Sequence, residues 1–483
     1  MNRKKFVSFF YNLCYHNNVS MLDYVFKKKG FCIFHIYVKS WIGNAWDKYM
    51  NIAVAGTGYV GLVTGGCLAS IGHHVTCVDI DEKKLERLRN GYPTIYEPGL
   101  EHLMQSCLSN LTFTADYKKA YKDAEVIFIG VGTPEKKDGS CNLTYVYQVV
   151  REIAESVERD CIVVVKSTVP IGTNDKVETL LHSKLAHPVN VEVASNPEFL
   201  SQGTAIHDTL HASRIVLGVE SEHAKNVLLE VYRKFHQPFV VTNRRSAEMI
   251  KYASNDFLAL KISYINEIAN LCELVGADIE SVAGGMGLDP RIGDKFLKSG
   301  IGYGGSCFPK DTKSLHWISN YYDKEIKTIK AAIEVNDSQK IRLIKKSKRY
   351  YDSFVGLTIA VLGLAFKPGT DDLREAPSLV NIPIFLDDEA IIKAWDPVAV
   401  ENYKRYYPTE ITYCDTIEEA LKDADICFIF TEWDEIKTFD VHKYSDLMKH
   451  AIILDGRNCY NTDAFKGTEI IYDSIGRPTV NAH

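Results

Sequence analysis

A cysteine stands in an unusual place in this chain. In the stretch GIGYGGSCFPKD, residues 300–311, Cys307 follows several glycines and precedes Pro309, Lys310 and Asp311. A structural cysteine is normally buried among apolar neighbours, whereas a thiol beside cations and backbone N–H groups can ionise and react as a nucleophile. The loop by itself leaves both a structural and a chemical role open for Cys307.

A second glycine pattern lies near residue 56. Gly56, Gly58 and Gly61 form GxGxxG between the strand-like run NIAVAG and a predicted helix, and Asp79 ends the next predicted strand. In this context the glycines let backbone N–H groups approach a pyrophosphate at the helix N-terminus. An acid at the position of Asp79 binds the ribose hydroxyls and repels a 2′-phosphate. The pattern therefore predicts a dinucleotide site that prefers NAD to NADP.

The elements that carry these residues alternate between strand and helix from Met50 onward, which predicts a parallel α/β architecture. The order of motifs also repeats loosely: residues 117–134 resemble 417–435, NIAVAGTGYVG resembles TIAVLGLAFKPG, and Asp79 corresponds to Asp396. We therefore expect two doubly wound Rossmann-like domains. The second lacks GxGxxG, so its cleft at the strand ends should take a different nucleotide.

Three cations lie at or just after predicted strand ends of the second domain. Lys367, Arg374 and Arg457 have the side chains that bind phosphates or ribose hydroxyls. Taken one at a time, each is better explained as ordinary surface charge.

A long helix should join the two domains. Residues 246–278 contain no proline, and no glycine before Gly276, and apolar residues recur at helical spacing. Lys251 and Asn255 are four residues apart and so share one face. We expect this helix to link the domains and to contribute to a dimer interface.

Composition excludes several classes of protein. The chain has 483 residues, 46% of them hydrophobic, and a net charge of −6, which gives no general attraction to nucleic acid or acidic lipid. Its cysteines show no CxxC, so we expect a reducing, cytoplasmic compartment rather than a disulfide framework. We assign no residue to a metal site.

Residues 1–49 differ from the rest, because they are basic and rich in aromatics. Their apolar runs are shorter than the roughly 20 residues that a membrane span needs. We interpret them as an N-terminal extension outside the core; a targeting or membrane-surface segment is the alternative.

Six motifs together resemble the UDP-glucose/GDP-mannose dehydrogenase family. In order they are GTGYVG, KSTVPIGT (166–173), NPEFLSQGTAI (196–206), IKYASNDF (250–257), GYGGSCFPKD (302–311) and GLAFKPGTDDLREAPS (363–378). The resemblance covers about residues 50–465 and implies three regions. These are an NAD-binding domain (50–245), a central helical region for dimerisation and the active site (246–340), and a domain binding the UDP-sugar (341–483).

The resemblance implies a chemistry for Cys307. Members of the family oxidise a nucleotide sugar, here UDP-glucose, at C6 in two steps that reduce two NAD. An aldehyde cannot readily donate a second hydride, so a thiolate first adds to it. The thiohemiacetal is then oxidised to a thioester, which water hydrolyses to the uronic acid.

Residue roles follow from the same resemblance. The catalytic group is Cys307, Lys251, Glu198, Asn255, Asp311 and Thr168, with Glu198 as the base and Lys251 and Asn255 stabilising the oxyanion. The cofactor group is Gly56, Gly58, Tyr59, Val60, Gly61, Asp79, Lys84, Thr133, Thr168, Gln202 and Arg374. The substrate group is Glu198, Lys251, Asn255, Arg291, Phe296, Lys298, Gly302, Tyr303, Gly304, Phe366, Lys367 and Arg457. N–H groups of the glycine loop would hold the pyrophosphate, and Arg291 would reach the substrate of a second subunit, which implies a homodimer or larger assembly.

One position departs from the family pattern. Gln202 stands where the family often has a second glutamate, so it cannot act as a base and cofactor affinity or pH dependence is expected to differ. Two alternatives stay open: the same chemistry on GDP-mannose or a UDP-N-acetyl sugar, and a non-catalytic nucleotide-sugar sensor. A sensor should have lost Cys307 or Lys251, and both are present.

Overall fold

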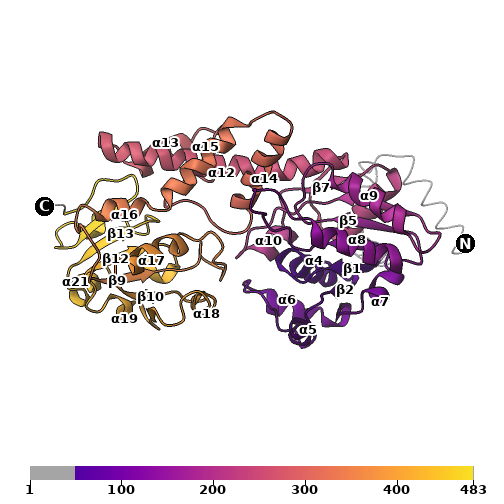
Figure 1. Ribbon diagram of the computed structural model, residues 1–483, viewed down its shortest axis with the longest axis horizontal. Helices are drawn as coiled ribbons and strands as arrows, with labels where there is room; N and C mark the ends of the chain where they lie inside the picture. The colour runs from indigo at the N-terminus through magenta and orange to yellow at the C-terminus, as the bar shows by residue number, and fades with distance from the viewer. Residues whose placement is uncertain (1–48, 482–483) are drawn as a thin grey trace, which may run out of the picture. The chain divides into compact units, whose positions relative to one another are not determined.

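Strands and helices alternate along the part of the chain that the computed structural model describes, residues 49–481 (Figure 1). The strands form two separate sheets, one of eight strands and one of six. The interpretation of residues 1–49 as an extension concerns residues that, apart from Tyr49, lie outside the described part.

The first sheet has the strand order β3-β2-β1-β4-β5-β6-β7-β8. Every neighbouring pair is parallel except β6 and β7, which meet in one antiparallel pair. The strands are β1 (Asn51–Ala55), β2 (His74–Val78), β3 (Leu111–Thr114), β4 (Val126–Ile129), β5 (Cys161–Val165), β6 (Val191–Ser195), β7 (Ile215–Gly218) and β8 (Phe239–Thr242).

Helices cover both faces of this sheet. Side chains of β1 alternate between two apolar cores, with Ile52 and Val54 in one and Ala53 and Ala55 in the other. One core takes α4 (Tyr59–Ser70), α5 (Glu82–Arg89), α6 (Leu100–Ser106), α10 (Ala205–Leu210) and α11 (Glu222–Val231); the other takes α7 (Tyr117–Lys122), α8 (Thr144–Ser156) and α9 (Thr173–Lys184). The predicted doubly wound domain is confirmed, and its buried strands are rich in β-branched residues, as a sheet covered on both faces requires.

The second sheet repeats the strand order of the first six strands. Its order is β11-β10-β9-β12-β13-β14, all parallel. The strands are β9 (Thr358–Leu362), β10 (Ile391–Trp395), β11 (Ile411–Tyr413), β12 (Ile426–Ile429), β13 (Ile452–Asp455) and β14 (Ile471–Ser474). The helices are α17 (Pro377–Asp387), α18 (Val400–Tyr403), α19 (Ile417–Leu421), α20 (Asp434–Lys437) and α21 (His442–Leu447). The loose repeat therefore reflects two copies of one topology.

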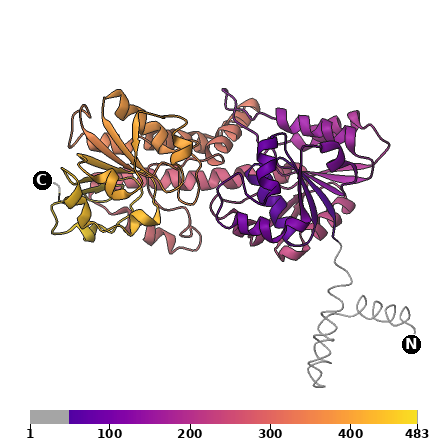
Figure 2. The same ribbon diagram turned by 90° about the horizontal axis from the view of Figure 1, so that it is seen from below.

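A single helix of 32 residues, α12 (Arg244–Val275), leads from the first sheet toward the second (Figure 2). Asn243 caps its start by accepting a hydrogen bond from the Ser246 N–H, and Gly276 ends it in the left-handed conformation. Beside it pack α14 (Phe308–Tyr321) and α15 (Lys327–Gln339), and α13 (Ile279–Gly287) and α16 (Arg342–Ser347) complete the central part. The predicted long helix is confirmed.

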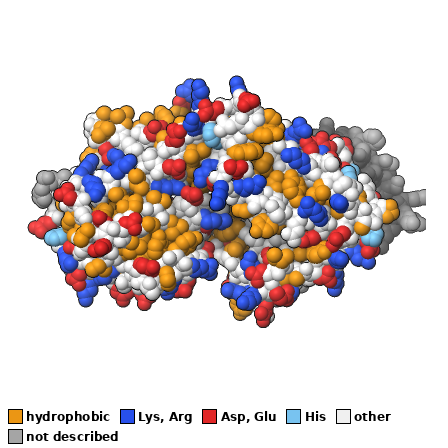
Figure 3. Space-filling view, in the orientation of Figure 1, with side chains coloured by type: hydrophobic (Ala, Val, Ile, Leu, Met, Phe, Trp, Pro, Cys, Tyr) orange, Lys and Arg blue, Asp and Glu red, His pale blue; other side chains and the backbone are white. Residues whose placement is uncertain are grey.

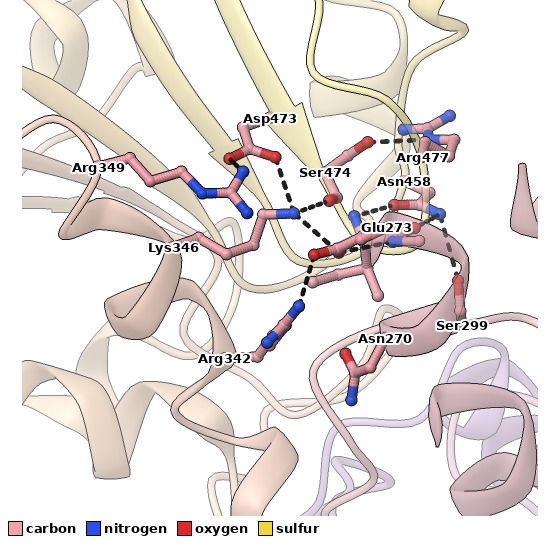
Figure 4. Close-up of polar contacts among 12 residues, drawn as sticks. Asn270, Glu273, Ser299, Arg342, Lys346, Arg349, Asn458, Asp473, Ser474 and Arg477 are labelled. Atoms are coloured by element: carbon pink, nitrogen blue, oxygen red, sulfur yellow. Dashed lines mark hydrogen bonds and ion pairs between the residues drawn. The ribbon is translucent and has the colours of Figure 1, made fainter. Parts of the chain in front are cut away.

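Two glutamates attach opposite ends of α12 to the two halves of the chain. Near its start, buried Glu248 accepts hydrogen bonds from the N–H groups of Gly172 and Asn174 at the beginning of α9. Near its end, Glu273 pairs with Lys346 at 2.8 Å and with Arg342. Lys346 also pairs with Asp473 of β14 at 2.8 Å (Figure 4). The contacts of Glu273 are thus ionic, whereas those of Glu248 are with neutral donors.

The surface and the thiols agree with the bulk properties. On the face drawn in Figure 3, Lys and Arg side chains are interspersed with Asp and Glu. The cysteines between residues 49 and 481 are free thiols. Within the same range, the structure contains no helix that is both long and apolar enough to cross a membrane.

Candidate active site

The backbone of the glycine loop after β1 packs closely against the start of α4. A Cβ atom on Gly61 would lie 2.0 Å from the carbonyl oxygen of Gly56, so only glycine fits there. Gly56 has φ +94° and its N–H donates to Val78 of β2. Gly58 caps α4, which begins at Tyr59 and Val60, so the loop presents a helix N-terminus. This arrangement fits the pyrophosphate of a dinucleotide.

Asp79 lies at the carboxyl end of β2, beside this loop. Its Oδ2 accepts a hydrogen bond from the Thr57 N–H at 3.0 Å, and its Oδ1 accepts from the Asp81 N–H at 3.1 Å. Burial opposes ionisation, but the hydrogen bonds from Thr57 and Asp81 and the charge of Lys84 lower the pKa of Asp79. The half-buried carboxylate is therefore charged at neutral pH, as repulsion of a 2′-phosphate requires.

Three other predicted residues follow the carboxyl ends of β4, β5 and β6. Thr133 donates from its hydroxyl to the Thr168 carbonyl at 2.9 Å, which joins the first two of these ends. Glu198 follows β6 and is buried. Cofactor and catalytic positions thus share one edge of the sheet, where ligands of doubly wound folds bind.

Cys307 lies at the N-terminal cap of α14, with Pro309 in the first turn. Burial raises the pKa of the Cys307 thiol, the charge of Glu198 adds to this, and the ammonium of Lys251 opposes it. These three side chains, which come from three distant segments, therefore lie within electrostatic range of one another. The thiol stands at the positive end of a 14-residue helix, where an anion is stabilised.

Lys251 contacts Glu198 directly. Its Nζ donates to the Glu198 carbonyl at 2.5 Å and to Glu198 Oε1 at 3.2 Å. Burial alone would lower the pKa of Lys251, but Glu198, Cys307 and Asp311 outweigh it, so the pKa is raised. A buried ammonium held in the charged state can stabilise a developing oxyanion.

Asn255 lies one helical turn after Lys251 on α12, as predicted, and holds Asp311. Its Nδ2 donates to Asp311 Oδ2 at 2.7 Å, and Lys310 Nζ lies 2.5 Å from Asp311 Oδ1. Asp311 is 1% exposed, so this is a buried pair and not a surface one. The shared face of α12 therefore presents a lysine and an asparagine to the two carboxylates of the site.

The glycine loop before Cys307 is held by its own protein partners. Gly300 N–H donates to Asn266, Tyr303 N–H to Asn336, and Gly305 N–H to the Arg374 carbonyl. Between residues 49 and 481, no protein acceptor is found for the N–H groups of Gly302 and Gly304. Fewer N–H groups of this loop than predicted are therefore left to bind an anion.

Arg457 donates hydrogen bonds to three backbone carbonyls. Its guanidinium donates to the carbonyls of Phe430 at 2.9 Å, Gly302 at 2.9 Å and Phe366 at 3.2 Å. It joins the end of β13 to the glycine loop and to the loop that follows β9. Lys367, also in that loop, donates to the Ser201 hydroxyl at 2.6 Å.

Other predicted substrate residues lie at the edge of the site or on the surface. Tyr303 is buried, with its ring centroid 5.8 Å from that of Phe308. Phe296 is exposed, in a left-handed conformation, and 6.2 Å from Phe308 by the same measure. Lys298 is exposed, and the Arg291 side chain is 88% exposed and paired with Asp289. Within this one chain, Arg291 is not brought to Cys307.

Sequence reasoning missed Glu97. This buried glutamate accepts hydrogen bonds from the Gly203 and Ala205 N–H groups, both at 2.7 Å, and from the Tyr59 hydroxyl. It joins the first turn of α4 to the loop that follows Glu198. No local pattern signals it, because its partners lie far away in the sequence.

Comparison with known proteins agrees with this geometry. Residues 50–236 match the profile of the UDP-glucose/GDP-mannose dehydrogenase family, NAD binding domain. Residues 245–338 match the central domain of the same family and residues 360–462 its UDP binding domain. A UDP-glucose 6-dehydrogenase of Bacillus subtilis is 52% identical over 433 residues, which cover 89% of this chain and 98% of the relative. The chain belongs to the UDP-glucose/GDP-mannose dehydrogenase family.

Other relatives of this chain match it over nearly the same length. A UDP-glucose 6-dehydrogenase of Rhizobium meliloti is 44% identical over 439 residues, covering 89% of this chain and 100% of that one. Among solved structures, a UDP-glucose dehydrogenase from the archaeon Pyrobaculum islandicum has a TM-score of 0.84 and 35% identity, covering 90% of this chain and 99% of its own. The family resemblance, the NAD cofactor and the assignment as a dehydrogenase are therefore confirmed.

Proposed function

We propose that this enzyme oxidises UDP-glucose at C6 to UDP-glucuronate in two NAD-dependent steps. The observation that carries the proposal is the convergence of Cys307, at the N-terminus of α14, with Lys251 and Glu198 in one buried site. A simple alcohol dehydrogenase has no need of a thiol there, whereas oxidation of an aldehyde to an acid does. The relatives named UDP-glucose 6-dehydrogenase support the choice of sugar.

The residues around the glycine loop after β1 would hold the cofactor. Backbone groups of Gly56, Gly58 and Gly61 face the pyrophosphate position, and Asp79 takes the ribose hydroxyls. NAD, when bound, accepts a hydride in each oxidation. We also assign cofactor contacts to Tyr59, Val60, Lys84, Thr133, Thr168, Gln202 and Arg374.

Cys307 would provide the covalent step. Its sulfur forms a bond to the carbonyl carbon of the C6 aldehyde, the C=O π bond breaks, and the thiol proton ends on the former carbonyl oxygen, which gives the thiohemiacetal. Charge develops on the former carbonyl oxygen, and Lys251 and Asn255 stabilise it. Once the adduct has become a thioester, Glu198 activates a water that attacks its carbonyl carbon. The C–S bond then breaks, and the thiol is regenerated as the carboxylic acid forms.

Asp311 and Thr168 would position this water. Asp311 is held between Asn255 and Lys310, so its carboxylate keeps one orientation. The hydrogen bonds of Arg457 to the carbonyls of Gly302 and Phe366 shape the pocket for the nucleotide sugar. Remaining substrate contacts are assigned to Arg291, Phe296, Lys298, Tyr303, Gly304 and Lys367.

A homodimer would complete the site. Phe257, Tyr264 and Leu271, seven residues apart on α12, are all exposed, and Leu274 and Val275 extend this apolar row. An exposed apolar row on a long helix is typical of a subunit interface. Arg291, remote from its own Cys307, would then serve the neighbouring subunit. We place the enzyme in the cytoplasm, where its free thiols stay reduced.

A second nucleotide sugar is the competing substrate. A UDP-D-ManNAc dehydrogenase from Pyrococcus horikoshii has a TM-score of 0.78 and 29% identity over 89% of this chain. Both substrates carry UDP, so the sugar ring must decide. The test is to supply NAD with UDP-glucose, GDP-mannose and UDP-N-acetyl sugars in turn, and to count NADH formed per sugar consumed.

UDP-glucose should give two NADH per sugar, and the other sugars much less turnover. Cys307→Ala should abolish formation of the uronic acid while NAD and sugar still bind. Cys307→Ser should accumulate a slow covalent sugar adduct, visible by intact-protein mass spectrometry, or stop before the second oxidation. Near-normal conversion by Cys307→Ala would remove the thiol from the mechanism.

A further inference from the structure

The loop that follows Glu198 touches the loop that follows β9 at several points. Lys367 Nζ donates to the Ser201 hydroxyl at 2.6 Å. A Cβ atom on Gly203 would lie 3.0 Å from the Gly369 carbonyl oxygen, so the two backbones are close. These contacts join the cofactor half of the chain to the nucleotide-sugar half beside the catalytic carboxylate.

Gln202 makes the central contact of this set. It is 9% exposed, and its Nε2 donates to Asp372 Oδ2 at 3.1 Å. The Thr370 hydroxyl lies 3.4 Å from its Oε1. Both ends of the amide are therefore used by the loop that follows β9.

Asp372, the partner of Gln202, also pairs with Arg374. Arg374 Nε lies 2.8 Å from Asp372 Oδ1, and Arg374 Nη2 lies 2.6 Å from Asp372 Oδ2, which is a two-point pairing of guanidinium and carboxylate. The Arg374 carbonyl also accepts from the N–H of Gly305, two residues before Cys307. Burial opposes the charge on Arg374, but Asp372 and, to a smaller extent, Cys307 raise its pKa, so Cys307 lies within electrostatic range of Arg374.

A glutamate at position 202 could not make this contact in its ionised form. It would place a carboxylate oxygen about 3 Å from that of Asp372, and like charges that close strongly disfavour joint ionisation. The amide of glutamine donates where a carboxylate would repel. The glutamine that stands at position 202 in place of the family's glutamate is therefore matched by its hydrogen-bond partner, Asp372.

We propose that Gln202 is a positioning residue that, through Asp372, fixes the Arg374 guanidinium at the junction of the two halves and does so independently of pH. This inference rests on the proposed function for the role of Arg374 toward the cofactor, but the contact itself belongs to the chain alone. Replacing the amide with a carboxylate should convert it into a pH-sensitive contact.

The sign of that sensitivity follows from the surrounding charges. Burial opposes ionisation of Asp372, but Arg374 and Gln202 lower its pKa, so it stays ionised in the wild type at neutral and alkaline pH. In Gln202→Glu, a proton shared between the carboxylate introduced at position 202 and that of Asp372 would restore the hydrogen bond at low pH. Loss of this proton at higher pH would break the hydrogen bond. The other charged groups on or beside the two loops are Glu97, Glu198, Asp208, Lys367, Asp371, Glu375, Arg405 and Glu432.

The test is a double-mutant cycle of Gln202→Glu, Asp372→Asn and their combination in the full chain. Gln202→Glu should raise the KM for NAD about tenfold near pH 9 and less near pH 6, with a smaller change in kcat. Hydrogen–deuterium exchange of residues 363–376, measured without ligand, should be faster in Gln202→Glu at the higher pH. In the combined variant the amide introduced at position 372 donates to the carboxylate introduced at position 202, so the effect on exchange should largely be reversed. The effect on the KM for NAD should remain, because an asparagine at position 372 cannot make the two-point pairing with Arg374.

Gln105→Glu is the matched control. Gln105 donates to Glu101 at 3.1 Å on the exposed surface of α6, so it undergoes the same change opposite a carboxylate away from the site. It should leave the KM for NAD and the exchange of residues 363–376 unchanged. If the effects of the single changes on exchange simply multiply in the combined variant, or if Gln202→Glu matches wild type in exchange at both pH values, the inference is overturned. Failure of the wild type to oxidise UDP-glucose would instead overturn the proposed function, because the exchange cycle needs no substrate.

Discussion

The two Rossmann-like halves of this chain share a strand order but differ in the loop between the first strand and the first helix. After β1 only the residues from Gly56 to Gly58 precede α4, so the helix N-terminus lies directly after the end of the strand. After β9 a loop of residues 363–376 comes before α17 and carries Phe366, Lys367 and Arg374. One half therefore offers backbone N–H groups to an anion, and the other offers side chains.

The aspartates that end the second strand of each half differ in the same sense. Asp79 is half-buried, and its carboxylate stands beside the glycine loop. Asp396 is 5% exposed and accepts from the N–H groups of Leu364, Ala365 and Ala399, among others. The same residue at the same place in the topology thus holds the fold in the second half, while in the first half it is left more open, as the proposed contact with the ribose requires. Topological equivalence does not imply functional equivalence.

The largest expected effect concerns the ionic attachment of α12 to the second half. Glu273→Gln leaves Lys346 and Asp473 in a buried, incomplete cluster, which should lower the free energy of unfolding by about 3–5 kcal/mol at neutral pH. Burial would raise the pKa of Glu273, but Lys346, Gly476 and Arg342 outweigh it and lower the pKa. Its stabilisation is therefore present above the unfolded pKa of about 4.3 and is lost as the pH falls through the folded value.

Glu248→Gln, at the opposite end of α12, is the control for this pH dependence. Burial raises the pKa of Glu248 despite hydrogen bonds from Asn174 and Gly172. Its stabilisation is therefore present below the unfolded pKa and declines as the pH rises through the folded value. In denaturant unfolding from about pH 2 to pH 7, the stability lost relative to wild type should grow with pH up to about 4.3 for Glu273→Gln, and should shrink with pH above about 4.3 for Glu248→Gln. Equal slopes would mean that the two attachments do not differ as described.

The next effect tests the glycine loop of the first half. Gly61→Ala places a Cβ atom against the Gly56 carbonyl, so the loop must move and NAD affinity should fall about a hundredfold. UDP binding should be kept, because the second half is unchanged. Gly285→Ala is the matched control, since Gly285 lies in α13, away from the cofactor loop, and a Cβ atom added there would meet no atom within 4 Å. Equilibrium binding of NAD and of UDP to each variant separates the outcomes, and equal loss of both ligands by Gly61→Ala would point to unfolding.

Asp396→Asn should act on stability rather than on NAD. An amide NH₂ would face backbone N–H donors that the carboxylate now accepts, at a cost of about 2 kcal/mol in the free energy of unfolding. The KM for NAD should stay near the wild-type value. Thermal unfolding and NAD kinetics on the same preparation would decide, and an unchanged melting temperature would contradict the structural role of Asp396.

The smallest effect belongs to the corresponding change in the first half. Asp79→Asn should raise the KM for NAD about tenfold and narrow the gap to NADP, because the negative charge beside the ribose is removed. The melting temperature should change little, since Asp79 is half-exposed. Steady-state kinetics with both cofactors would measure this, and a wild type that used NAD and NADP equally well would show that Asp79 is misplaced.

Local sequence patterns predicted a large part of the site. GxGxxG between a strand and a helix, and Lys251 and Asn255 one helical turn apart, are short-range features whose geometry follows from backbone periodicity. The family motifs added Cys307, Glu198 and Asp311. The contacts of Gln202 with Asp372, of Glu97 with Gly203 and of Arg457 with Gly302 had no such signal, because each joins segments that are far apart in the chain.

By itself, the sequence determined the two α/β halves, the long helix and the residue types of the chemistry, because strand and helix periods, glycine turns and apolar runs are local properties of the chain. Tertiary structure alone decided which polar side chains are buried and hydrogen-bonded within the fold and which are left open. Asp79 and Asp396 occupy equivalent places in the repeat, yet Asp396 is buried and accepts from the N–H groups of five residues, whereas Asp79 is half-buried and accepts from two residues. The burial and hydrogen bonding of a polar group depend on every segment packed around it, and these meet only in the folded chain.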